Sequence, residues 1–173
     1  MDPYGLNAIF ITDVDAVGGF GHTSVIIQDD YDDWYYCYWG SSEAICIYLY
    51  PEEVYSLETL NYALHQDYMG EAKYKGDYDY YVTVQGDFSD GLQYYANIIN
   101  KADTVGNNQN NKNYNVLYNN CTQTSTIAMA YGILPDGKSF SEYLSSNNLI
   151  PVVQFYNVLS AAGKSGYGFW GKR

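Results

Sequence analysis

A cysteine stands where a β-type run gives way to a helical one. Tyr114 to Tyr118 has the apolar and aromatic residues of a strand, two asparagines follow, and Cys121 then opens a segment of helical composition that ends near Tyr131. The first N–H groups of a helix lack intrahelical partners and the helix dipole is positive there, so a thiolate at this position is stabilised and its pKa falls. The pattern predicts a reactive thiol at Cys121.

A histidine lies at the head of an apolar strand far upstream. His22 follows a glycine-rich approach and precedes the run that ends at Gln28. An imidazole close to a thiol can act as the general base that activates it. We therefore expect Cys121 and His22 to form a catalytic dyad, with the Cys121 N–H as one donor to the oxyanion. The second histidine, His65, falls late in a helical pattern, and we expect it to be exposed and without a catalytic role.

The elements that must position this pair are of both types. The 173 residues can form one domain with its own core, and we expect residues 7–173 to do so in the α+β class. Alternation and breaker residues predict strands at Asn7–Thr12, His22–Gln28, Trp34–Trp39, Ala44–Tyr50, Asp79–Gln85 and Tyr114–Tyr118. Helical spacing predicts helices at Ser56–Gln66 with Ser56 as N-cap, at Ser89–Lys101, from Cys121 onward, and, shorter, at Ser139–Ser145 and Pro151–Ala162. The tail from Gly163 to Arg173 is expected to be loosely docked.

The strand hairpin suggests what orients the imidazole. Pairing the hairpin about its centre places Gln28 opposite Trp34 and His22 opposite Gly40. On that register Tyr38 is the nearest polar diagonal neighbour of His22, and we predict it as the third catalytic residue. A slip of one residue would bring Cys37 or Ser41 there instead.

Composition excludes several classes of function. The net charge of -12 repels phosphate backbones and anionic lipid headgroups, so nucleic acid is an unfavourable substrate. No stretch approaches the roughly 20 apolar residues of a membrane span, so we expect no membrane insertion. The cysteines form no C-x-x-C pair, and we expect neither a zinc site nor another cofactor. Cys37 and Cys46 fall inside strands and are expected to be buried small apolar residues, although one disulfide plus one nucleophile also fits the count of three.

His22 on a strand followed much later by Asn-Asn-Cys121 at a helix start resembles the circularly permuted branch of papain-like hydrolases, which is related to NlpC-type cell-wall peptidases and lecithin retinol acyltransferase. The resemblance covers Gly21 to Trp39 and Tyr114 to Tyr131. It implies a papain-like fold with an antiparallel sheet packed against the helix of the nucleophile. The family's third catalytic residue is a histidine or another polar residue on the strand after the first histidine, and here Trp34–Trp39 contains no histidine.

The first residues carry a second resemblance. Asp2-Pro-Tyr-Gly-Leu6 is similar to the Asp-Pro-x-Gly-Leu tag that closes the core of Rhs-repeat polymorphic toxins, after which a variable toxin domain follows. The resemblance implies that residues 1–6 are a remnant of this junction, that Met1 is an added start, and that the domain is secreted as part of a larger Rhs protein and delivered into a target bacterium. It also implies a cognate immunity protein as partner.

Together these features predict an antibacterial effector that acts as a cysteine peptidase or amidase on a peptide or peptidoglycan substrate. Acyl transfer to a lipid or amine is the closest alternative, since the same acyl-enzyme can pass its acyl group to another acceptor. A non-catalytic module with a tyrosine-rich face for glycan or protein is a rival from another class. A nuclease is disfavoured by the acidic charge and by the lack of a His/Asp/Glu metal cluster.

Overall fold

A computed structural model of the chain describes residues 7–16, 21–40, 44–65, 77–101, 120–145 and 150–172. Its centre is a six-stranded antiparallel sheet with the strand order β4-β3-β2-β1-β5-β6. The strands are β1 (Asn7–Asp13), β2 (His22–Gln28), β3 (Trp34–Trp39), β4 (Ala44–Leu49), β5 (Tyr80–Gln85) and β6 (Gly168–Lys172). The class is therefore α+β, as the sequence predicts.

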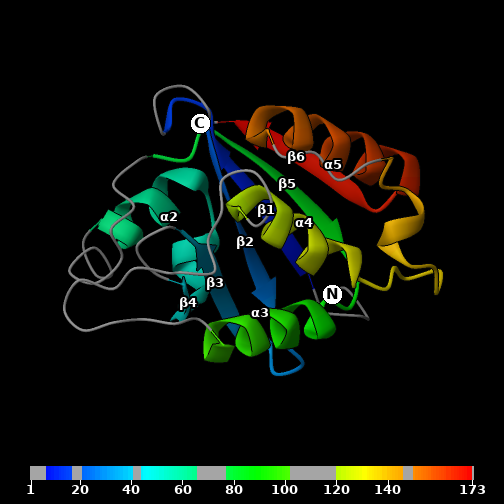
Figure 1. The fold of residues 1–173 in the computed structure, drawn as a ribbon, viewed down its shortest axis with the longest axis horizontal. Coiled ribbons are helices and arrows are strands. Elements are labelled where there is room, and N and C mark those ends of the chain that lie inside the picture. Colours follow the sequence, from blue (N-terminus) through cyan, green and yellow to red (C-terminus); the bar gives the residue numbers. More distant parts are fainter. Residues whose placement is uncertain are drawn as a thin grey trace.

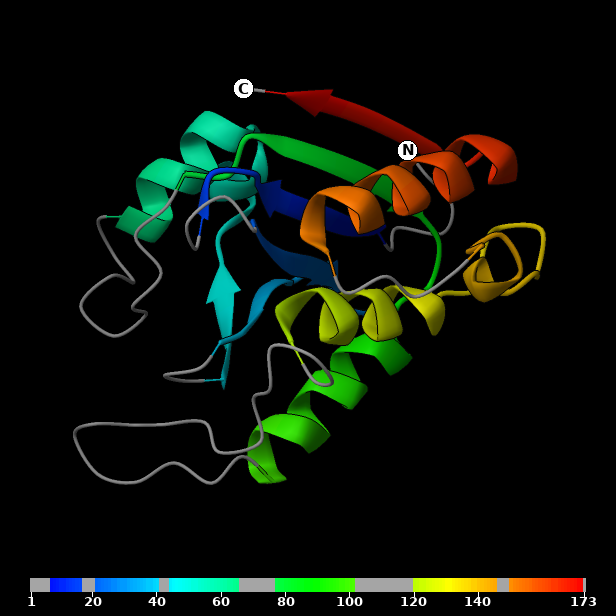
Figure 2. The same cartoon turned by 45° about the horizontal axis from the view of Figure 1, so that its top comes forward.

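Most of the helices pack on one face of the sheet. The helices in the described residues are α2 (Leu57–Ala63), α3 (Ser89–Lys101), α4 (Cys121–Ala130) and α5 (Pro151–Ser165), with 3-10 turns η1 (Pro51–Val54) and η3 (Phe140–Glu142). Figures 1 and 2 show α3, α4 and α5 on one side of the sheet and α2 apart from them, near the end of β1. The helix that begins at Cys121 packs directly on β2, the strand that begins at His22.

Alternation along the strands divides the interior into two cores. One core lies under α3, α4 and α5, where Phe10, Val25 and Trp39 pack with apolar residues of these helices. The other lies on the α2 side, where Ile26, Tyr36 and Tyr38 pack with Leu57 and Leu60. Successive strand residues point to opposite faces, so β2 contributes Val25 to one core and Ile26 to the other. A strand whose seven residues are all buried fits this central place in the sheet.

The predicted hairpin register is confirmed, because Gln28 pairs with Trp34 and Val25 with Cys37. Ser56 is the N-cap of α2, and its Oγ accepts the Thr59 N–H at 3.1 Å. The helix predicted near Ser139 is shortened to the turn η3, for which Ser139 is the N-cap. The strand predicted at Tyr114–Tyr118 lies outside the described residues.

The prediction of a loosely docked tail is wrong. Helix α5 ends at Gly166, which has a φ of +77° and so adopts the left-handed conformation that glycine takes at low cost. The chain then turns back and forms β6, an edge strand in which Phe169 pairs with Thr83. The short sequence of β6 contains two glycines and no β-branched residue, so local propensity does not indicate a strand. Pairing with β5 supplies the hydrogen bonds that create it.

Two helical glycines give a matched test of the packing between α3 and α4. A Cβ added at Gly91 would lie 2.5 Å from the carbonyl oxygen of Ala128, whereas one added at Gly163 would meet nothing within 4 Å. We expect Gly91→Ala to destabilise the fold by about 1–3 kcal/mol because the two helices must separate. We expect Gly163→Ala to stabilise it by about 0.5–1 kcal/mol, since alanine is the better helix former. Urea unfolding of both variants measures the difference, and equal stabilities would contradict the close approach of the helices.

Candidate active site

The N-terminus of α4 holds Cys121 in place. Asn120 is the N-cap residue in an extended conformation, and its side-chain oxygen accepts the Gln123 N–H at 3.0 Å. This cap satisfies one of the N–H groups that the first turn leaves without helical partners. Cys121 is the first residue of the helix and is 4 % exposed. The thiol therefore lies at the positive end of the helix dipole, as the sequence predicts.

Buried hydroxyl groups make the first turns of α4 compatible with the core. Thr122, Thr124, Ser125 and Thr126 are all buried. The hydroxyls of Thr124 and Thr126 donate back to the carbonyl oxygens of Asn120 and Thr122, at 3.0 and 2.7 Å. Ser125, one turn after Cys121, forms a 3.0 Å hydrogen bond with the hydroxyl of Tyr95 from α3. This bond fixes α4, the helix that begins at Cys121, against α3.

The backbone before β2 places His22. The Thr12 hydroxyl of β1 donates to the carbonyl oxygen of His22 at 3.0 Å. Gly21 has a φ of +82°, and its N–H donates to the Ala16 carbonyl oxygen at 2.9 Å. A Cβ at Gly21 would lie 3.0 Å from Cβ of Pro151, so both the conformation and the space favour glycine at this turn. His22 is 3 % exposed at the start of the strand.

The structure brings Cys121 and His22 together. Burial by itself raises the pKa of the Cys121 thiol. The charge of the His22 ring and a hydrogen bond to it outweigh burial, and a hydrogen bond from the Thr23 backbone and one from the Thr122 side chain act in the same direction, so the pKa falls to about 6. At neutral pH this favours the thiolate, which is the reactive form of the cysteine. The proximity of these two residues, far apart in the sequence, agrees with the predicted dyad.

Tyr38 lies beside His22 as the hairpin register predicts. The centroids of the two rings are 4.9 Å apart and their planes are tilted by 42°. Tyr38 is 6 % exposed. Its hydroxyl lies over Gly40, where an added Cβ would collide with it. The ring of Tyr38 thus packs on the imidazole, and its role as third catalytic residue stays a prediction. The other residue considered for this role, Ser41, lies outside the described residues.

Sequence reasoning missed a polar neighbour of the imidazole. Ser24 Oγ lies 3.2 Å from Nε2 of His22, and Ser24 is fully buried. Ser24 is two residues after His22, so the two side chains share one face of the strand. The alternation of side chains along the strand could have placed Ser24 beside His22. A single serine inside an apolar strand does not by itself indicate a functional role, however. The second histidine, His65, lies elsewhere, and its Nε2 forms a 2.7 Å hydrogen bond with Asp77 Oδ1.

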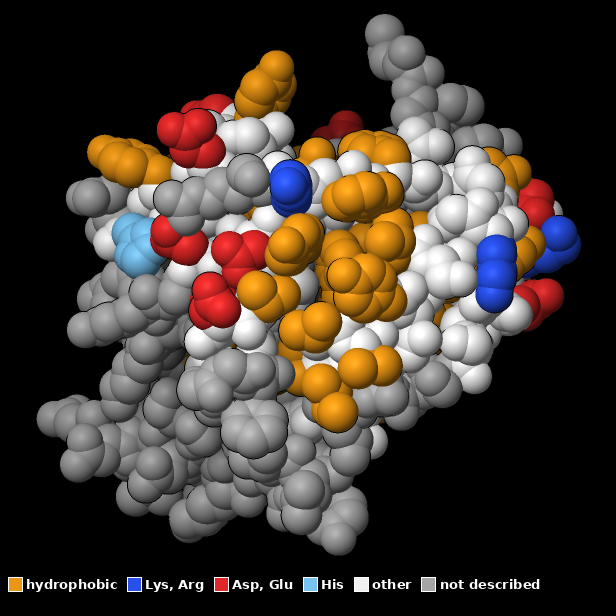
Figure 3. Space-filling view, turned by 90° about the horizontal axis from the view of Figure 1, so that it is seen from above, with side chains coloured by type: hydrophobic (Ala, Val, Ile, Leu, Met, Phe, Trp, Pro, Cys, Tyr) orange, Lys and Arg blue, Asp and Glu red, His pale blue; other side chains and the backbone are white. Residues whose placement is uncertain are grey.

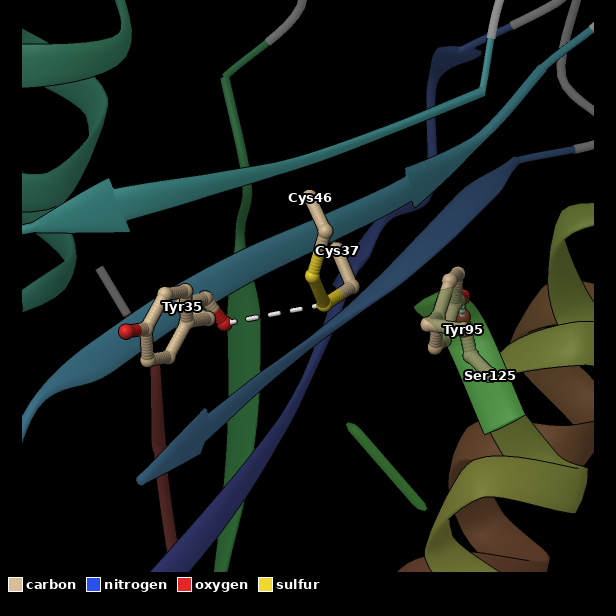
Figure 4. The surroundings of a disulfide bond; sticks show 5 residues. All are labelled: Tyr35, Cys37, Cys46, Tyr95 and Ser125. Carbon is tan, nitrogen blue, oxygen red and sulfur yellow. Dashed lines mark hydrogen bonds between the residues drawn. A yellow bond between two sulfur atoms is a disulfide. The ribbon is translucent and has the colours of Figure 1, made fainter. Parts of the chain in front are cut away.

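The other two cysteines are joined to each other. Cys37 and Cys46 pair directly across β3 and β4 and form a disulfide, with a Cα–Cα distance of 4.2 Å. Figure 4 shows the bridge between the adjacent strands, and Tyr95 and Ser125 of the helical layer in its surroundings. Of the two alternatives that the sequence left open, the structure has the disulfide, because the strand pairing brings the two cysteines face to face. Cys121 is the free cysteine of the chain.

A cavity of about 350 Å³ lies away from this pair. Its walls come from the α2 side of the sheet and include Ile9, Trp34, Leu60, Tyr81 and Phe169. Cys121, His22 and Tyr38 are not among its lining residues. The edge strand β6 adds exposed aromatic side chains at Phe169 and Trp170, and Figure 3 shows hydrophobic side chains gathered at the centre of the surface seen from above.

The described residues contain neither a candidate metal site nor a membrane-spanning helix. Among the described residues, no three His, Cys, Asp or Glu side chains gather where they could hold a metal ion. No helix in the described ranges has the length and apolar character needed to cross a bilayer. Comparison with protein-family models, curated proteins and solved structures gives no match for this chain.

Proposed function

We propose that this protein is a cysteine hydrolase of papain-like type that cleaves amide bonds through Cys121 and His22. The observation that carries the proposal is the buried contact between the thiol of the first residue of α4 and a strand histidine, with a pKa of Cys121 lowered to about 6. Buried thiols in apolar surroundings have raised pKa values, so a lowered pKa at a 4 % exposed thiol points to a nucleophile.

The residues support a two-step reaction. The Cys121 thiolate attacks the carbonyl carbon, and the oxyanion that forms can accept a hydrogen bond from the Cys121 N–H at the start of α4. The His22 imidazolium then gives its proton to the leaving amine, which leaves an acyl-enzyme. Water, deprotonated by the neutral imidazole, hydrolyses this thioester and restores the thiolate. If a lipid or amine takes the place of water, the same acyl-enzyme transfers its acyl group.

The biological setting belongs to the same proposal. The Asp-Pro-Tyr-Gly-Leu segment supports an effector domain carried by an Rhs-repeat toxin and delivered into a target bacterium. A producing cell then needs an immunity protein that covers the site. Because the net charge is -12, we expect the contact patch of that protein to be basic and its association to slow as salt rises.

Expression in a test bacterium examines this function. The domain is directed to the cytoplasm in one strain and to the periplasm in another, and growth is followed after induction. We expect wild-type domain to stop growth in at least one compartment. Arrest in the periplasm alone would indicate cell-wall peptides as substrate, and arrest in the cytoplasm alone would indicate a cellular protein. Normal growth of both strains with folded protein present would contradict a toxic hydrolase.

A further inference from the structure

His22 borders a ring of three buried hydroxyl groups. Tyr78 donates to Ser24 Oγ at 2.8 Å, Ser24 donates to the hydroxyl of Tyr36 at 3.5 Å, and the hydroxyls of Tyr36 and Tyr78 are 2.8 Å apart. All three residues are at most 1 % exposed. Nε2 of His22 approaches this ring at Ser24 Oγ, at 3.2 Å.

The donor directions around the ring indicate whether Nε2 of His22 donates or accepts a hydrogen bond. Each hydroxyl carries one proton and accepts through its lone pairs. Tyr78 donates to Ser24 and Ser24 donates to Tyr36, so the Tyr36 proton completes the circle at Tyr78. The Ser24 proton is then donated to Tyr36, so Ser24 Oγ presents a lone pair to Nε2. In this arrangement Nε2 is the donor, and Nδ1 is the ring nitrogen that can take the thiol proton.

The ring is anchored to a separate element of the fold. The side chain of Asn61 on α2 donates to the Tyr78 carbonyl oxygen and accepts the Tyr78 N–H, both at 3.0 Å. Asn61 is 5 % exposed. These two bonds fix the backbone of Tyr78, and through its hydroxyl they fix Ser24. The position of the imidazole thus depends on α2, on the side of the sheet away from α4.

Other ionisable groups lie around His22. Tyr38 packs on its ring from β3, and the ring of Tyr78 lies with its centroid 6.3 Å away. Cys121 approaches from α4. Asp13 pairs with His22 across β1 and β2, and its Oδ1 accepts the backbone N–H groups of Asp15 and Ala16 at 2.8 and 3.0 Å. The Asp13 carboxylate thus binds a backbone turn, and Nε2 of His22 lies 3.2 Å from Ser24 Oγ.

We propose that Ser24, Tyr36 and Tyr78 are positioning residues, whose closed hydroxyl ring accepts the Nε2 proton of His22 and holds Nδ1 toward Cys121. This inference rests on the proposed function, in which His22 exchanges a proton with the thiol. A ring of neutral hydroxyls would then orient the imidazole, a role that a carboxylate or an amide has in many hydrolases.

Removing the Ser24 hydroxyl tests the ring directly. In Ser24→Ala the imidazole loses the hydroxyl that holds it toward Cys121, so the contributions of His22 that lower the thiol pKa weaken. We expect the pH midpoint of Cys121 alkylation by iodoacetamide to rise by about one unit. Ser24→Thr keeps the hydroxyl and should return the midpoint to near the wild-type value. Ser165→Ala is the control and should not move the midpoint, because this hydroxyl bonds to the Ala162 carbonyl oxygen and the Tyr167 N–H at the C-terminal end of α5.

Nitrogen NMR of the imidazole gives a readout that a merely structural role would not change. The chain has two histidines, so His65→Ala assigns the signals in protein labelled with ¹⁵N-histidine. Above the midpoint we expect the Nε2–H tautomer of His22 in the wild type and a mixture of tautomers in Ser24→Ala. Tyr78→Phe opens the ring one bond away and should shift both readouts in the same direction by less. Tyr156→Phe, at a 64 % exposed tyrosine, is its control.

Three results would overturn the proposal. One is a folded Ser24→Ala protein with the wild-type midpoint and tautomer. The second is a shift in Tyr38→Phe with none in Ser24→Ala, which would make Tyr38 the orienting residue. The third is a shift in Asp13→Asn with none in Ser24→Ala, which would make the Asp13 carboxylate the orienting group. A wild-type midpoint in the ordinary thiol range would instead refute the dyad itself, so the two failures are distinguishable.

Discussion

Cys121→Ala is expected to abolish toxicity in whichever compartment the wild-type domain stops growth. In the proposed reaction the sulfur forms the covalent intermediate, and removal of an attacking nucleophile typically costs about 10⁴–10⁶ in rate. The change should leave the fold intact, because α4 is held by Asn120 at its cap and by the bond between Ser125 and Tyr95. Growth curves after induction, with the variant and the wild type at equal soluble levels, measure the effect.

The remaining cysteines provide the control for this experiment. A variant in which Cys37 and Cys46 are both alanine loses the disulfide but keeps the free thiol of the chain. We expect it to remain toxic at temperatures where it is folded. Killing by Cys121→Ala at the wild-type dose would show that the activity does not depend on the thiol, and the binding module would then be the better account.

The second large effect is expected in the pH profile of thiol alkylation in His22→Ala. The thiolate is the reactive form, so the alkylation rate rises with pH through the pKa of Cys121. In the wild type we expect a midpoint of about 6. Without His22, the burial that raises the pKa remains and the two contributions of the ring that lower it are lost. The midpoint should therefore move above the ordinary thiol value of about 8.5.

The midpoint is more informative than the rate at one pH. A rise from about 6 to about 9 lowers the thiolate fraction at neutral pH roughly 100-fold. The more basic thiolate is about 20-fold more nucleophilic, however, because intrinsic reactivity rises with pKa. The net change at pH 7 is then only several-fold. Mass spectrometry of protein alkylated without reductant reports a single site, since Cys37 and Cys46 are bridged.

His65→Ala is the matched control for the loss of an imidazole. His65 pairs with Asp77 at 2.7 Å, and both side chains are more than one third exposed. We expect its removal to leave the midpoint near 6. If His22→Ala keeps the low midpoint, the helix terminus alone activates the thiol and the dyad is not supported.

The candidate pair was predictable because each member is specified by local sequence. Asn120 before Cys121 is a good N-cap at a change from strand to helix, and a helix start is electrostatically special wherever it occurs. The glycine before His22 has the positive φ that its turn requires. The hairpin register also follows from local information, since the turn between Gln28 and Trp34 determines which residues face each other.

The polar surroundings of the imidazole were not predictable in the same way. Ser24 could be placed on the face of His22 by alternation, but Tyr78 reaches it from a distant segment and is fixed there by Asn61. The disulfide is another such case, because it depends on the register between β3 and β4. Strand β6 exists only through its hydrogen bonds to β5. Contacts of this kind depend on how whole elements pack, and the sequence carries no local signal for them.

The sequence by itself therefore determined the α+β class, most helix and strand positions, and the identity of the thiol and the histidine. These depend on propensity, capping and alternation, which act within a few residues. Only the tertiary structure decided that Cys121 and His22 meet, that burial and the imidazole compete for the thiol pKa, and that a ring of hydroxyls lies behind His22. The physical reason is range: hydrogen bonds and charge interactions act over a few ångströms in space, and residues far apart in the chain come that close only after folding.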